Sequence, residues 1–62
     1  MSIILEENNS YKLSKEGQSI EFFVIKLNSS KNIAEAKVTS HGDKRQLFYI
    51  NELENSPFIS KI

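Results

Sequence analysis

The residues that could carry acid–base chemistry are few and lie in polar segments. Carboxylates occur close together twice, at Glu6-Glu7 and at Glu52 with Glu54. Acid–base catalysis needs such groups positioned in a water-excluding pocket, whereas neighbouring carboxylates in polar turns are mostly solvated charges. A chain of 62 residues leaves little volume for such a pocket. We therefore expect no enzymatic activity.

Metal ligands are equally scarce. The chain has no cysteine and one histidine, His41, whereas a zinc site needs about three or four ligands. The segment SHGDK around Asp43 lacks the alternating oxygen ligands and the final glutamate of a calcium loop. There is also no glycine-rich phosphate loop. We expect no metal and no cofactor, and an exposed His41 in a turn beside Gly42.

One local basic cluster is present. Lys44 and Arg45 lie near His41, and Lys37 lies across the predicted turn. In a hairpin these four side chains can converge on a phosphate backbone, so they are our candidate nucleic-acid contacts. Against this, eight basic and eight acidic residues cancel in number, and binding to a polyanion requires several phosphates to be neutralised together.

Polar turn clusters divide the chain into short segments, a length that favours strands over helices. The alternating residues 11–14 and the β-branched and aromatic run 20–27 flank Gly17 and predict a hairpin. The run 45–50 predicts a third strand, with Leu47 and Tyr49 on one face and Phe48 and Ile50 on the other.

The segment 32–39 is ambiguous. Ala34, Ala36 and Val38 alternate as in a strand, but its alanine, glutamate and lysine also favour a helix. We favour a strand because the segment leads directly into a glycine-containing turn and a strong strand. A helix at 30–38 would instead give an α+β fold.

The C-terminal region predicts one helical turn and a short closing strand. Asn51 can cap a turn, Glu54 stands at the capping-box spacing, and Pro57 prevents continuation. A strand, a single helical turn and a last strand at 58–62 resemble the closing element of SH3-like small barrels. The expected fold is therefore one all-β domain over 1–62, a small antiparallel sheet or a five-stranded SH3-like barrel.

Three runs, at 3–5, 22–25 and 47–50, place large apolar groups on both faces of a strand. In one interpretation the sheet curls into a barrel, and β-bulges or the termini cover the second face. In the other, some of these apolar groups lie in an interface. The candidate interface residues are Phe23, Phe48 and Tyr49. Because disulfides and metals cannot stabilise this small core, we also expect a homo-oligomer, formed by edge pairing of the first or last strand.

These features predict a small non-catalytic module that binds a larger protein and occludes a surface on it. Its size, balanced charge and many Asn, Lys and Ile residues resemble accessory or inhibitor proteins of phages and other mobile elements. The alternative is a small nucleic-acid-binding β-barrel. The opening MSIILEENN lacks the basic region and long apolar stretch of a signal peptide, so a cytoplasmic location without membrane association is expected.

Overall fold

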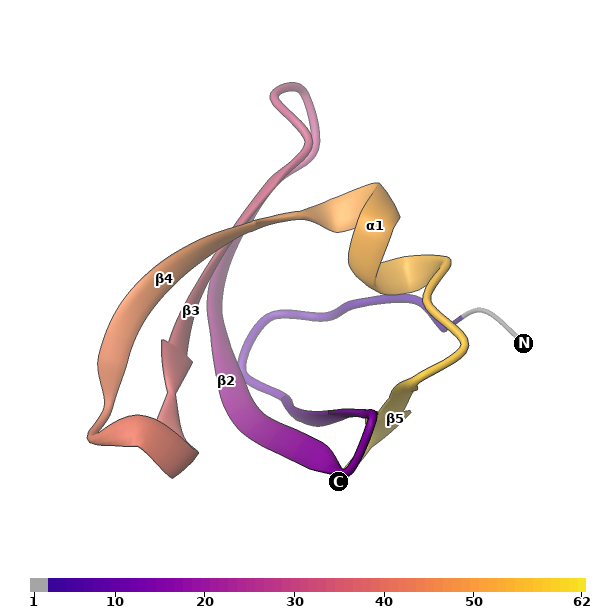
Figure 1. The fold of residues 1–62 in the computed structure, drawn as a ribbon. Helices are drawn as coiled ribbons and strands as arrows, with labels where there is room; N and C mark the ends of the chain where they lie inside the picture. Colours follow the sequence, from indigo (N-terminus) through magenta and orange to yellow (C-terminus); the bar gives the residue numbers. More distant parts are fainter. Residues whose placement is uncertain (1–2) are drawn as a thin grey trace.

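The structure is a computed structural model that describes residues 3–62. Five strands form most of the fold (Figure 1). The elements in order are β1 (Ser10–Lys15), β2 (Gln18–Asn28), β3 (Ile33–Val38), the 3-10 helix η1 (Thr39–His41), β4 (Lys44–Tyr49), α1 (Ile50–Glu54) and β5 (Ile59–Lys61). The predicted β-dominated fold with one helical turn near the C-terminus is confirmed. The helical alternative for 30–38 is excluded, because residues 30–32 lie in a turn and Ile33–Val38 form β3.

The strands form one antiparallel sheet in the order β4-β3-β2-β1-β5. The first four strands are joined as successive hairpins, and β5 returns to pair with β1. The sheet curls around the N-terminal segment, with β4 at the left and β5 at the lower right of Figure 1. Because β4 and β5 do not pair, the sheet is open, although its strand order is consistent with the SH3-like arrangement. The first strand is internal, so its predicted role as a free edge is wrong.

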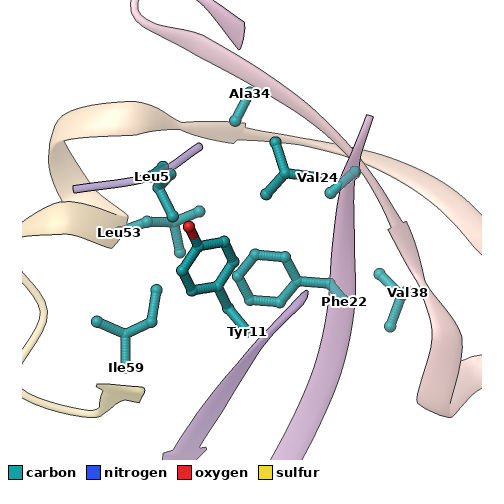
Figure 2. Close-up of a cluster of buried hydrophobic side chains, with 9 residues drawn as sticks. Leu5, Tyr11, Phe22, Val24, Ala34, Val38, Leu53 and Ile59 are labelled. Carbon is teal, nitrogen blue, oxygen red and sulfur yellow. The ribbon is translucent and has the colours of Figure 1, made fainter. Parts of the chain in front are cut away.

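The core lies on the concave face of the sheet. Tyr11 and Phe22 occupy opposite positions on β1 and β2, and their ring centroids are 5.9 Å apart (Figure 2). Phe48 on β4 lies 5.3 Å from Phe22 by the same measure. On the intervening strand β3, Val38 lies opposite Phe22 and Ala34 lies opposite Phe48, with Ala36 between them on the same face; both alanines are fully buried. These small side chains leave the space in which aromatic rings from β2 and β4 meet.

A β-bulge on β2 increases the curvature of the sheet. Val24 and Lys26 pair with consecutive residues of β3, which leaves Ile25 without a partner there. The pairing of β2 with β1 ends at Phe23, before this bulge. The Glu7 carboxylate accepts a hydrogen bond from the backbone N–H of Leu27 at 2.9 Å, so a side chain satisfies a donor that the sheet leaves open.

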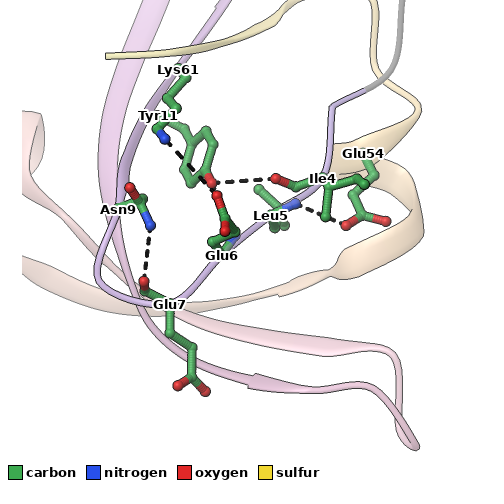
Figure 3. Close-up of polar contacts among 8 residues, drawn as sticks. All are labelled: Ile4, Leu5, Glu6, Glu7, Asn9, Tyr11, Glu54 and Lys61. Carbon is green, nitrogen blue, oxygen red and sulfur yellow. Dashed lines mark hydrogen bonds and ion pairs between the residues drawn. The ribbon is translucent and has the colours of Figure 1, made fainter.

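The segment 3–9 crosses the concave face without forming a strand. Leu5 is buried in the core, and its N–H donates to the Glu54 carboxylate at 2.9 Å (Figure 3). The Glu6 N–H donates to the hydroxyl of buried Tyr11 at the same distance. Ile4, between them, is 79% exposed. The run 3–5, expected to be a strand with two apolar faces, is therefore not a strand; it places Leu5 in the core and Ile4 in water.

The start of α1 is capped from another part of the chain. The helix begins at Ile50, so Asn51 lies inside it and does not cap it as predicted; Glu54 binds Leu5 instead of closing a capping box. The cap comes from Asn32, in the turn between β2 and β3. Its Oδ1 accepts from the Asn51 N–H at 3.0 Å, and its Nδ2 donates to Asn51 Oδ1 at 2.7 Å.

Asn32 also has a left-handed backbone (φ 59°), which glycine adopts without cost. We expect Asn32→Gly to lower the free energy of unfolding by about 1 to 2 kcal/mol, because it removes the cap and leaves the turn geometry intact. Urea denaturation measures this change.

The matched control is Asn8→Gly. Asn8 has a similar backbone (φ 65°) and is exposed, and its side chain makes no hydrogen bond within residues 3–62. Equal destabilisation by the two substitutions would show that the Asn32 side chain does not cap α1.

Candidate functional site

The convex face of β2, β3 and β4 is the outer surface of the sheet. Residues directly opposite each other on paired strands share a face, so the register defines this surface row by row. From β2 to β4 the rows are Asn28–Ile33–Tyr49, Lys26–Glu35–Leu47 and Phe23–Lys37–Arg45.

An apolar patch lies at the β4 side of this face. Leu47 is 63% exposed and Tyr49 is 55% exposed. Ile33, half-buried, lies directly opposite Tyr49 and lines a depression of about 160 Å³ together with Leu47. We call Ile33, Leu47 and Tyr49 the outer patch. They form a continuous apolar surface across two strands.

Charged side chains of both signs flank the outer patch. Arg45 Nη1 lies 3.2 Å from Glu35 Oε2, and Lys26 and Lys37 occupy neighbouring rows. An exposed ion pair of this kind contributes little to stability. An apolar centre with a polar rim is, however, the usual composition of a protein–protein interface.

The free edge of β4 presents backbone groups beside the outer patch. The Ile50 N–H donates to the Asn32 carbonyl at 3.0 Å. This bond identifies the residues of β4 whose backbone groups point toward β3. Hydrogen-bonded pairs alternate along antiparallel strands. The N–H and C=O groups of Arg45, Leu47 and Tyr49 therefore point away from β3. Within the part of the chain that the structure describes, no strand pairs with this edge.

The three predicted interface residues do not form one surface. Tyr49 is exposed on the outer face, and Phe23 is half-buried on the same face, in the row of Lys37 and Arg45. Phe48 is half-buried on the concave face against Phe22. Neighbouring strand residues point to opposite faces, so Phe48 and Tyr49 cannot contact one flat partner together.

Two residues of the outer patch were not among the predicted interface residues. Leu47 was detectable, because the alternation in 45–50 already places it on the same face as Tyr49. Ile33 was not detectable, because its position opposite Tyr49 depends on the register between β3 and β4.

The four candidate nucleic-acid contacts are also divided between faces. Lys37 and Arg45 are directly opposite each other on the outer face. Lys44 is opposite buried Val38 and so belongs to the concave side. His41 is exposed in η1, with its Nδ1 2.9 Å from Ser40 Oγ. The structure therefore brings together one basic pair, and Arg45 of that pair is bound to Glu35.

Three of the four carboxylates considered for chemistry have structural contacts. Glu7 accepts from the Leu27 N–H. Figure 3 shows Glu54 accepting from the Leu5 N–H, and Glu6 with its carboxylate 4.0 Å from Lys61 Nζ. Among residues 3–62 no three His, Asp or Glu side chains are grouped so that they could hold a metal ion. Nor does this part of the chain contain a helix of the length and apolar character needed to cross a membrane.

No protein-family profile matches the chain, and searches of curated proteins and of solved structures find no significant similarity.

The two faces of β4 predict different effects on stability. We expect Phe48→Ala to lower the free energy of unfolding by about 2 to 4 kcal/mol, because it removes a ring packed on Phe22. Tyr49→Ala should change it by about 0.5 kcal/mol or less, because that ring is mostly in water. Urea denaturation of the two variants measures both values, and a larger loss for Tyr49→Ala would contradict this assignment of the faces.

Proposed function

We propose that the chain is a small non-catalytic protein-binding module whose outer patch docks on a larger protein. The observation that carries the proposal is the exposure of two large apolar side chains, Leu47 and Tyr49, side by side on one face of an edge strand. Isolated exposed apolar residues are ordinary, but a contiguous group with a charged rim is typical of an interaction site.

The energetics of the outer patch support this function. Removing a large apolar side chain from water contributes about 1.5 to 3 kcal/mol when burial is complete. Leu47 and Tyr49 each retain more than half of their exposure in the single chain, so most of this contribution is still available to a complex. Tyrosine is also enriched among the residues that dominate binding energy.

We further propose that the chain is an accessory or inhibitor protein that acts by covering a surface on its partner. A chain of this size has a thin core and offers an exposed face instead of an enclosed cavity. It is therefore better suited to covering a partner's surface than to catalysing a reaction. Its balanced charge and its resemblance in composition to proteins of phages and mobile elements support that role. The cytoplasm is the compartment we propose for it.

We expect Tyr49→Ala and Ile33→Ser each to weaken binding to the partner by about 1 to 4 kcal/mol if these residues are central contacts. The partner is first isolated with the tagged wild-type chain from cells that naturally produce it, and affinities are then measured by calorimetry. Ile62→Ser is the control, because Ile62 is 62% exposed but lies outside the outer patch. If Ile62→Ser weakened binding as much as the patch variants, the outer patch would not be the docking site.

The same experiment separates protein binding from the nucleic-acid alternative. We expect retention of the partner to survive nuclease treatment, and affinity to depend only weakly on salt, because the patch is apolar. If the partner were a nucleic acid, Lys37→Ala and Arg45→Ala would each reduce the slope of log affinity against log salt by about one unit. A steep salt dependence of the wild-type chain would overturn the protein-binding proposal.

A further inference from the structure

We propose that two copies of the chain associate through their β4 edges, antiparallel and in register, with Leu47 facing Leu47 of the second copy. This inference concerns the backbone edge of β4, and it goes beyond the proposed docking of the outer patch on a different protein. It joins two five-stranded sheets into one.

The backbone of β4 is suited to such pairing. The N–H and C=O groups of Arg45, Leu47 and Tyr49 point away from β3, as the phase of the ladder requires. An exposed edge of this kind is a template for another strand. All three edge-facing residues are exposed, so an approaching strand meets no covering element of residues 3–62.

The other free edge is less suited. β5 has three residues, against six in β4. Very short edge strands resist the addition of another strand. The last strand, one of the two routes predicted for self-association, therefore offers fewer backbone groups than β4.

The residue sequence of β4 selects the antiparallel direction. The strand begins with Lys44 and Arg45, and the helix that follows it carries exposed Glu52. Antiparallel pairing sets the basic start of one copy near the acidic end of the other, whereas parallel pairing sets like charges side by side.

The same sequence selects the register. A two-fold axis at Leu47 places each Arg45 opposite Tyr49 of the second copy, where a guanidinium can lie over an aromatic face. An axis at Arg45 would oppose two like charges, and an axis at Tyr49 would run half of the pairing into α1. An axis at Gln46 would set Leu47 against Arg45 and separate the two leucines. An axis at Phe48 would pair Leu47 with Tyr49 of the second copy, but it would set Arg45 against Asn51, inside α1. The axis at Leu47 brings both outer patches together and also keeps residues 45–49 paired along their whole length.

Sedimentation of the purified chain tests the dimer without any partner. We expect wild-type protein to be dimeric at about 100 µM and to dissociate on dilution, as for an affinity in the micromolar range. Leu47→Lys should raise the dissociation constant at least about tenfold, because it places two like charges about 5.5 Å apart in Cα separation at the axis. Ile62→Lys, at a position of nearly equal exposure (62% against 63%), should leave the dimer unchanged.

Because the chain has no cysteine, single-cysteine variants report the register directly. We expect Leu47→Cys to form a disulfide-linked dimer under mild oxidation, since a hydrogen-bonded pair has the Cα separation that a disulfide needs. Gln46→Cys and Ile62→Cys are the comparison variants. Circular dichroism of each variant verifies that the fold is retained.

A monomer at all concentrations, an unchanged dimer for Leu47→Lys, or faster linkage at Gln46 than at Leu47 would each overturn the proposed dimer. These outcomes are independent of partner binding. Ile33→Ser, which alters the outer patch on β3 but not the β4 edge, should weaken partner binding and preserve the dimer. The dimer and the proposed function can therefore fail separately.

Discussion

The packing of three aromatic rings across four strands is the constraint on which the rest of the fold depends. Tyr11, Phe22 and Phe48 form a continuous row through the concave side, and the small side chains of Ala34 and Ala36 on β3 leave room for the rings of β2 and β4 to meet. Because both alanines are fully buried, a larger residue at either position would overpack the core beside the rings. In a chain without cysteine, this row supplies much of the cohesion that larger domains obtain from a thicker core.

Local sequence patterns predicted the strands well. They predicted only in part which face of each strand meets the core and which is exposed. The alternation of Ala34, Ala36 and Val38 left a strand and a helix open, and the glycine-containing turn that follows favoured the strand. In β3 all three residues are buried on one face. In β4 the pattern separated Leu47 and Tyr49 from Phe48 and Ile50, but it could not say which side meets the core. Both sides are apolar, so the decision depends on which strands lie nearby in the folded sheet.

The polar contacts that complete the fold were beyond sequence reasoning. The hydrogen bonds that the N–H groups of Leu5, Leu27 and Asn51 donate join residues far apart in the chain; the acceptors are Glu54, Glu7 and Asn32, respectively. Each satisfies a backbone N–H that regular secondary structure leaves open. Their residue types are common in surface turns, so nothing in their local setting distinguishes them before the topology is known.

The return of β5 to β1 has a consequence for how the domain is made. β1 to β4 are successive hairpins, so their contacts can form as each segment leaves the ribosome. β5, in contrast, pairs Ile59 with Leu13 and Lys61 with Tyr11, across nearly the whole length of the chain. Until these residues are synthesised, one side of β1 lacks its backbone partners and Tyr11 lacks part of its cover. We therefore expect folding to be completed only after translation has passed this strand, with closure of the longest loop as its slow step.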